Sequence, residues 1–458
     1  MKKTGKQILV RLGLIALCLI ATPIILFLIW RIRLANEVNS RLATIRAAGL
    51  PTSGAEVNSH HPPVVDTENS ALVMTQAFAL MIEFTGQRSN EIAQFEMPSR
   101  LQPLTDKQVA LLADYVLMNS NALVKAESAL TLTESHYPVN FSAALYALFP
   151  HLQKLRNLAQ IEEFRSALAI HNGQFTEATE ALVNMPKMAA TLDEESTVIA
   201  QLVRARILEM TFRLFERRAN TSNFDANELT AFAAALPVSE RTNALAKSLV
   251  WDRALLMPYF RGSWSQISPI LNPSAAPVDA ADLTLESGHQ SMFIRASGFY
   301  ERDLLLYMHA METNIARAVL PPPQCLTAKQ SNDRAAEVAR QRLCILSAVF
   351  LPSYSKIIDR SVENTARMRL ANAAIAIERF HMANGRFPRS LAEIIPNYAQ
   401  ITPTDPFNGE PLRYKSLDNG YQIYSVGKDG GDDGGREKPP SKKATDQTPY
   451  DITFTVER

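Results

Sequence analysis

Net charge is nearly absent from this chain of 458 residues, in which 47 basic and 46 acidic side chains almost cancel. No global electrostatic field therefore indicates nucleic acid as a partner. Glycine is also scarce, with 17 residues against 26 prolines, while alanine and leucine occur throughout. Apolar residues make up 47% of the chain and charged residues 20%, a balance typical of folded proteins. The composition predicts a mostly helical fold with room for two or three domains.

The motifs of several common enzyme classes are missing. The chain has no G-x-S-x-G nucleophile elbow, no H-E-x-x-H zinc motif, no C-x-x-C pair and no P-loop. The acidic run DEES at 193–196 is typical of a helix start or a solvated face. Histidines do not cluster at metal-ligand spacing, so we interpret them as solvated, capping or half-buried side chains: His60, His61, His136, His151 and His171. These absences argue against an enzyme, although catalytic groups assemble in space and not in sequence.

Cysteine is rare, with three residues in the whole chain. Cys18 lies inside an apolar N-terminal run, and Cys325 and Cys344 are the two that lie outside it. If the main body is extracytoplasmic, these two thiols can pair across the proline-rich loop at 321–323. The alternative is two unpaired thiols, with Cys344 buried in a helix. The sequence leaves both readings open.

Residues 12–30, LGLIALCLIATPIILFLIW, form a run of 19 residues without a charge. At about 1.5 Å per residue, this length crosses a hydrocarbon core of about 30 Å. A cleaved signal peptide would usually have a shorter apolar region and a small-x-small cleavage site, which is missing here. We therefore predict an uncleaved single-pass membrane anchor, with residues 1–34 as N-terminal tail and transmembrane segment. The basic residues flanking the run do not decide its orientation, because both sides carry similar numbers.

Residues 35–352 predict a helical domain. An amphipathic helix continues over 36–48, and Asp66 or Thr67 is the expected N-cap of the next helix. The segment 164–185 predicts a helical hairpin in which Asn172-Gly173 closes the first helix. It resembles one unit of a tetratricopeptide-like array, but no second copy follows at a fixed period. A further helix is expected over about 331–350.

Aromatic residues gather in the segment 251–300, which holds Trp251 and Trp264. Together with Tyr259, Phe260 and Arg261 they form either the lining of a groove or a corner where helices pack. The sequence favours the packing corner and leaves the groove open.

Residues 353–458 predict a small α+β domain. A long helix carries one apolar stripe, which comprises Val362, Ala366, Leu370, Ala373, Ile377 and Phe380. Asn384-Gly385 supplies its C-terminal stop. The alternating segments PLRYKSL and YQIYSV, joined by an Asn-Gly turn, predict a β-hairpin, and YDITFTVE predicts a third strand with Ile452, Phe454 and Val456 on one face.

Four segments of this domain occur in a recognisable order, which is NGRFP at 384–388, DPFNGEPLRY at 405–414, GYQIYSVGKDGG at 420–431 and DI at 451–452. They resemble the globular head of the major pseudopilin of type II secretion systems and of related type IV pilin-like proteins. The resemblance covers about 100 of the 458 residues. The start of the chain, with RLATIRAAGLPTSGAEVN followed by ENSA, resembles membrane-anchored helical proteins of environmental bacteria that end in such a head.

The resemblance implies a long helix packed on a small antiparallel sheet, and a calcium ion bound in the loop after the hairpin. Matched residue by residue, Asp429 is the implied ligand, with Asp432, Asp433 and Asp451 as its partners. Calcium takes six to eight oxygen ligands, and glycines let the backbone turn tightly enough to present its carbonyls. The alternative is a solvated flexible acidic loop. A phosphate site is not expected, because no helix follows the glycines and the carboxylates would repel an anion.

Three functions remain open from the sequence. The first is a membrane-anchored envelope protein that acts by protein–protein contact, in association with a type II secretion or pilus-like assembly. The second is an extracytoplasmic helical module that binds a peptide or glycan, which a long concave surface would favour. The third is an envelope enzyme with its site near residues 251–261, which a pocket with perturbed carboxylates would favour. We expect the first, in a bacterial inner membrane with the body in the periplasm, since the upstream tail is short and the head resembles a pseudopilin.

Overall fold

The computed structural model describes residues 2–60, 64–142, 149–237, 242–262, 296–326, 329–439 and 448–458. Predictions for His61 and Trp264 lie outside the described residues. The described chain is mostly helical and ends in a small sheet, which confirms the coarse fold class. Its helices are α1 Lys2–Ala47, α2 Gly54–Ser59, α3 Ser70–Leu80, α4 Gln87–Ala93, α5 Asp106–Met118, α6 Ser120–Ala129, α7 Pro150–His171, α8 Phe175–Ala190, α9 Val198–Ala219, α10 Ala226–Ala235, α11 Thr242–Leu256, α14 Phe299–Val319, α15 Lys329–Gln341 and α16 Ile345–Asn384.

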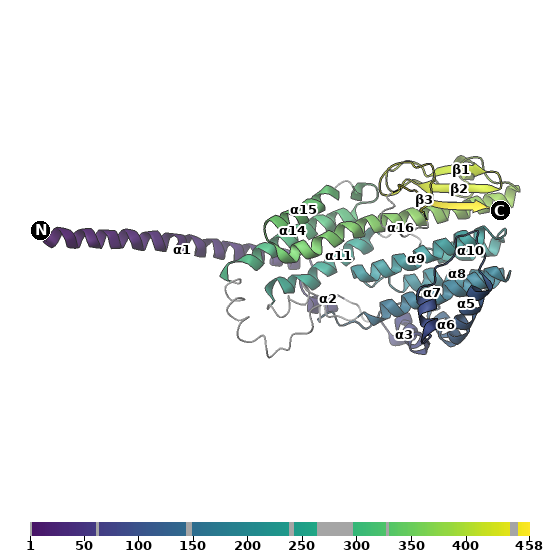
Figure 1. Ribbon diagram of the computed structural model, residues 1–458, viewed down its shortest axis with the longest axis horizontal. Helices are drawn as coiled ribbons and strands as arrows, with labels where there is room; N and C mark the ends of the chain where they lie inside the picture. Colours follow the sequence, from purple (N-terminus) through teal and green to yellow (C-terminus); the bar gives the residue numbers. More distant parts are fainter. Residues whose placement is uncertain are drawn as a thin grey trace.

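The helix α1 projects from the body like a handle (Figure 1). It is the one helix among the described residues that is long and apolar enough to cross a membrane. Its C-terminal part lies alongside α14, where Arg31 pairs with Glu301 at 3.0 Å and Arg41 pairs with Glu312 at 3.4 Å. The uncharged run 12–30 therefore leads directly into a docked segment, without a linker between them.

The helix α16 runs through the length of the body (Figure 1). Its first half packs in a core with α11, α14, α15 and the end of α1. Its second half packs in another core with α3, α5–α10 and the sheet. The predicted apolar stripe from Val362 to Phe380 is buried throughout, and the helix ends at Asn384 with Gly385 at φ +65°. Position 353, the expected start of the C-terminal domain, lies inside this continuous helix.

The sheet has three antiparallel strands in the order β1 Arg413–Leu417, β2 Gly420–Ser425 and β3 Ile452–Glu457. The hairpin turn consists of Asp418 and Asn419, because Leu417 pairs with Gly420. The expected Asn-Gly turn is therefore wrong by one residue. Gly420 is already in the strand, where an added Cβ would collide with the carbonyl of Val456. Ile452, Phe454 and Val456 are buried against α16 and its neighbours, as the alternation predicted.

The helical hairpin at 164–185 is confirmed, since α7 ends at His171, Asn172 is its C-cap and α8 begins at Phe175. The N-cap of α3 was predicted wrongly. Asn69 occupies it and accepts the N–H of Ala71, whereas the expected caps lie in a short 3-10 helix, Asp66–Glu68. Asn69 is the N-cap because its side chain also forms hydrogen bonds with the backbone of His136, which lies in a distant segment.

The helix expected over 331–350 is interrupted between α15 and α16. The carboxylate of Asp303 on α14 accepts the N–H groups of Leu346 and Ser347 at 2.8 and 3.1 Å, which caps a new helix start. Leu343, in the connecting turn, has a φ of 57°. A partner from another helix thus ends the continuity that the local pattern predicted.

The structure also bears on the cysteine pairing and on the aromatic segment, which the sequence left open. Cys325 and Cys344 are buried and unpaired thiols, so the disulfide reading is wrong for this structure. Burial raises the pKa of both thiols. Trp251, Tyr259 and Phe260 are buried, which confirms the packing corner for these three residues, whereas Arg261 is exposed.

Candidate functional site

The acidic loop behind β2 is anchored by a residue that sequence reasoning missed. Asp405 is fully buried and accepts hydrogen bonds from the hydroxyl of Ser425 at 2.9 Å and the N–H of Val426 at 2.8 Å. The loop then turns through glycines with positive φ at 427, 430, 434 and 435. A carboxylate that bonds two consecutive residues fixes the point at which the strand ends and the loop begins.

The four predicted calcium ligands differ in their surroundings. Asp432 accepts the N–H of Gly434 at 3.0 Å and the hydroxyl of Tyr424 at 3.2 Å, and it contacts Arg413 at 3.4 Å. The N–H of Gly434, supported by these side chains, holds the pKa of Asp432 below its ordinary value. Asp429 is exposed and accepts the N–H of Gly431 at 3.3 Å.

Asp451 and Asp433 lie next to each other at the base of the loop. Asp451 accepts the N–H of Gly435 at 2.7 Å and that of Asp433 at 3.5 Å. Burial raises the pKa of Asp451, and the neighbouring carboxylates of Asp433 and Asp432 raise it further. Across the described ranges, no three His, Cys, Asp or Glu side chains are grouped so that they could hold a metal ion. Calcium at this loop stays a prediction from the resemblance.

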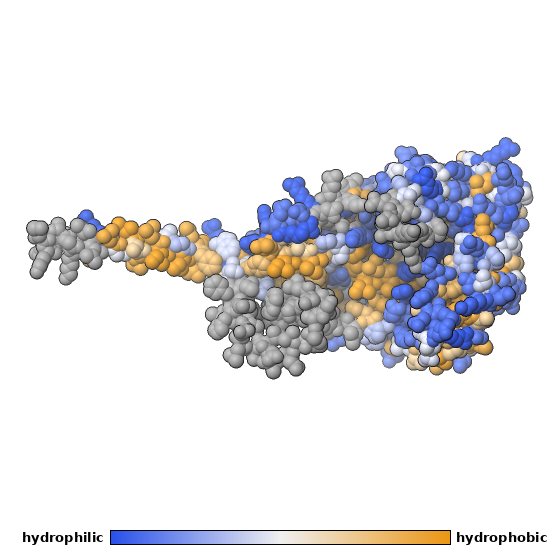
Figure 2. Space-filling view, in the orientation of Figure 1, coloured by the Kyte–Doolittle hydropathy of each residue, from blue (hydrophilic) through white to orange (hydrophobic). Residues whose placement is uncertain are grey.

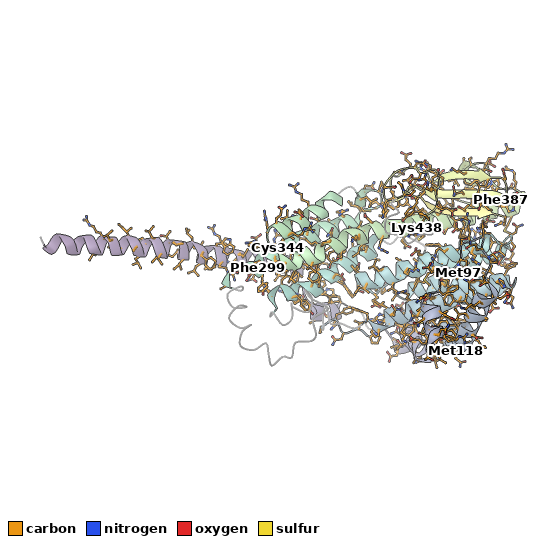
Figure 3. The ribbon with its side chains drawn as sticks, in the orientation of Figure 1. Met97, Met118, Phe299, Cys344, Phe387 and Lys438 are labelled. Atoms are coloured by element: carbon orange, nitrogen blue, oxygen red, sulfur yellow. The ribbon has the colours of Figure 1, made fainter. Side chains whose placement is uncertain are left out.

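A charged cleft of about 450 Å³ lies between the sheet and the helical body. It lies where the residues after Glu437 and those leading into β3 meet α9 and the segment 96–100. Its described lining comprises Glu96, Met97, Pro98, Ser99, Arg100, Glu163, Glu209, Arg213, Leu214, Glu216, Arg217, Arg367, Glu437, Lys438, Pro439, Tyr450, Asp451, Ile452 and Thr453. Met97 and Lys438 are labelled in Figure 3 and come from opposite sides of this cleft.

The charged groups of the cleft bond across it. Arg100 donates to Glu437 at 2.8 Å and to Glu457 at 2.9 Å. Glu216 accepts the N–H of Thr455 at 2.7 Å. Burial raises the pKa of Glu216 to about 7. A perturbed carboxylate in a polar pocket is the feature that would favour an enzyme. Glu216 and Arg100, however, both bond residues of β3, so we interpret the cleft as the contact that holds the sheet on α9.

An exposed apolar face lies at the end of the body farthest from α1. Ile82, Leu117, Met118 and Val124 expose 49%, 72%, 37% and 66% of their surface, and we call them the distal apolar face. Leu117 and Val124 line one cleft of about 380 Å³ beside the end of α7. Figure 2 shows apolar surface in this region, and Figure 3 labels Met118 there.

The buried residue Asn119 builds this face. Its amide oxygen accepts the N–H of Ile82 at 2.8 Å, and its amide nitrogen donates to the carbonyls of Ile82 and Tyr115 at 3.0 and 2.9 Å. Asn119 lies between the end of α5 and the start of α6, and its hydrogen bonds hold the segment after α3 against this junction. Apolar side chains from three segments are thereby brought to one surface.

A buried pair of a histidine and a glutamate was also missed. His151 lies 2.8 Å from the carboxylate of Glu195 and stacks on Tyr137, with ring centroids 4.4 Å apart. Glu195 belongs to the run 193–196 and is 6% exposed, so the expectation of a solvated face is wrong for this residue. The two partners are 44 positions apart, and no local signal links them. The pair packs inside the helical body.

In comparisons with known proteins, no family model, curated protein or solved structure matches the chain. The function is therefore argued from the geometry and from the sequence resemblance of the C-terminal segments. Of the surfaces described above, the distal apolar face is the one that exposes large apolar side chains.

Proposed function

We propose that this chain is a single-pass membrane protein that mounts a rigid helical body on the membrane and binds a partner protein through the distal apolar face. The supporting observation is the location of that face. Contiguous exposed apolar residues mark an interaction surface, and this surface lies at the opposite end of the body from the anchor (Figures 1 and 2). The distal apolar face therefore does not contact the membrane that holds α1.

The body is built to hold this face at a fixed distance. The 40 residues of α16 extend about 60 Å at 1.5 Å per residue, from the end where α1 docks to the end that carries the sheet. The first half of α16 packs against the anchor-side helices and the second half against α9, α10 and the sheet. A continuous helix shared by both cores resists bending between them.

The class of partner follows from the pseudopilin-like segments of the head. We infer a bacterial envelope protein of a secretion or pilus-like assembly, with α1 in the inner membrane and the body in the periplasm. The loop containing Asp429 then adds calcium-dependent stability to the head. The partner supplies an apolar surface, because the exposed side chains of the distal apolar face offer van der Waals contact and few hydrogen bonds.

Site-specific photo-crosslinking in intact cells tests the proposal. A photoreactive residue at Leu117 or Val124 is expected to form an adduct with one envelope protein. Ile401, which is 75% exposed and lies outside the face, serves as the control position. The adduct at Leu117 is expected to disappear when Val124→Asp places a charge in the same cleft.

Equal adducts at Leu117, Val124 and Ile401, or none at the first two, would contradict the proposal. An adduct that persists unchanged with Val124→Asp would contradict the role of the face, because an apolar contact cannot tolerate an unpaired carboxylate.

A further inference from the structure

A ridge of exposed apolar side chains lies at the end of the body where α1 enters it. Leu343, Ile345 and Val349 expose 69%, 42% and 46% of their surface. They occupy the turn before α16 and its first turns, and we call them the basal ridge. Phe299 and Cys344, labelled in Figure 3, lie at this end of the body.

Polar contacts fix the height of the basal ridge along α1. Arg31 is the first charged residue after the uncharged run, and it pairs with Glu301 in the first turn of α14 at 3.0 Å. Asp303, two residues further, accepts the N–H of Leu346 at 2.8 Å. The start of α16 therefore lies within about one helical turn, or about 5 Å, of the level at which the uncharged run ends.

For an α1 that crosses a bilayer, this level falls at the membrane surface. The 19 uncharged residues of 12–30 cover about 28 Å along the helix axis, close to the hydrocarbon thickness of about 30 Å. Headgroups add about 5 to 7 Å on each side. When α1 spans the bilayer, Leu343 and Ile345 fall in the headgroup layer, and Val349 lies about one helical turn further out.

Exposed arginines lie at the same level as the ridge. They are Arg33 on α1, Arg302 on α14 and Arg342 in the turn before α16. Arg302 donates to the carbonyl of Arg342 at 2.8 Å, so its charge is held beside the turn that carries Leu343. The acidic groups in the first turns of α14 are engaged, since Glu301 pairs with Arg31 and Asp303 caps α16. Cationic side chains beside apolar ones are typical of surfaces that bind anionic lipid.

We propose that the basal ridge inserts into the headgroup layer of the membrane that holds α1, and that Arg302 and Arg342 bind anionic lipid headgroups there. This inference rests on the anchoring in the proposed function. Continuity with the anchor selects the occupant, because a ridge tethered at this height meets the bilayer before any other partner. Two contacts, α1 and the ridge, then fix the tilt of the body on the membrane.

Spin labels on the full chain in lipid nanodiscs test this inference. Single cysteines replace Ile20 in the span, Leu343 in the ridge and Ile401 on the head, after Cys18→Ala, Cys325→Ala and Cys344→Ser remove the native thiols. Collisions with oxygen report lipid, and collisions with a water-soluble nickel chelate report water. Labels at 20 and 343 are expected to favour oxygen and the label at 401 to favour nickel. Arg342→Glu is expected to shift position 343 towards nickel in anionic nanodiscs and to leave it unchanged in zwitterionic ones.

The labels at positions 20 and 343 distinguish failure of the basal ridge from failure of the anchor. Oxygen preference at 20 with nickel preference at 343 overturns the basal ridge and leaves the anchor intact, whereas nickel preference at 20 overturns the anchor as well. No effect of Arg342→Glu in anionic nanodiscs overturns the lipid-binding role of the arginines. A photoreactive anionic lipid on the unmodified chain gives a readout that needs no substitution, and an adduct in the peptide containing 343–349 is expected. The absence of that adduct, with adducts in 12–30, overturns the inference.

Discussion

Removing the charge of Glu216 tests the description of the charged cleft most sharply. Burial raises the pKa of this carboxyl from 4.5 to about 7, while the N–H of Thr455 and the charge of Arg100 act in the opposite direction. The folded chain therefore keeps a proton that the unfolded chain loses between pH 4.5 and about 7. In that window the folded state binds more protons, so the free energy of unfolding falls as the pH rises. The full effect is about 3 kcal/mol, at about 1.4 kcal/mol for each pH unit.

Glu216→Gln keeps an oxygen that accepts the N–H of Thr455 and removes the ionisation. The unfolding free energy of the variant minus that of the unmodified chain is expected to grow by about 3 kcal/mol between pH 4 and pH 8. Urea unfolding of the full chain in detergent, followed by circular dichroism at each pH, measures this difference. Other buried carboxyls with raised pKa values, Glu162 and Asp252, are common to both proteins and cancel.

Glu337→Gln is the matched control, because this exposed carboxylate has a pKa lowered by hydrogen bonds from Arg340 and Gln341. Its stabilising effect is present at high pH and is lost as the pH falls, so the variant's difference is expected to run in the opposite direction. A Glu216→Gln difference that stays constant from pH 4 to pH 8 would refute the reasoning. It would show that Glu216 is hydrated and that the cleft is open to water around it.

Three further predictions concern single contacts, each measured by unfolding of the full chain. Arg458→Met is expected to lower the free energy of unfolding by about 3 to 5 kcal/mol, because the carboxylate of Glu378 stays buried without its cation. Glu378 is 1% exposed and lies 2.6 Å from Arg458. A loss below about 1 kcal/mol would contradict this. Asn119→Ala is expected to lower the free energy of unfolding by about 2 to 5 kcal/mol, since the N–H and carbonyl of Ile82 lose their hydrogen-bond partner. An unchanged unfolding midpoint would show that water replaces the amide. Calcium at 100 times its dissociation constant is expected to add about 2.7 kcal/mol, and Asp429→Ala to remove that gain; identical unfolding with and without calcium would exclude the ion.

Features determined by residues that are adjacent in the sequence were predictable. Asn384-Gly385 ends α16 because glycine adopts the positive φ that the C-cap requires. The same local chemistry predicted the α7–α8 turn at Asn172-Gly173. The alternation of Ile452, Phe454 and Val456 predicted the buried face of β3, since side chains alternate along a strand.

Features made by partners distant in sequence were not predictable. The break at Asn119 depends on the backbone of Ile82, and the start of α16 depends on Asp303 of another helix. For the second break, the helical pattern of residues 331–350 continues through the start of α16, so pattern reasoning predicted one helix there. The raised pKa of Glu216 likewise arises from burial under β3, more than 230 positions away. The candidate surfaces follow from such contacts, which explains why the sequence located the acidic loop and missed the distal apolar face and the basal ridge.

The most direct test of the membrane topology is the accessibility of the N-terminal tail and of the C-terminal head in bacterial spheroplasts. Cysteines placed singly at Lys3 and Ile401, without the native thiols, are treated with a membrane-impermeant maleimide. An anchored chain with a periplasmic body is expected to stay in the membrane after alkaline carbonate extraction. Position 401 is expected to be labelled in intact spheroplasts, and position 3 only after permeabilisation. Release by carbonate would contradict the anchor, and labelling of position 3 with protection of position 401 would contradict a periplasmic body.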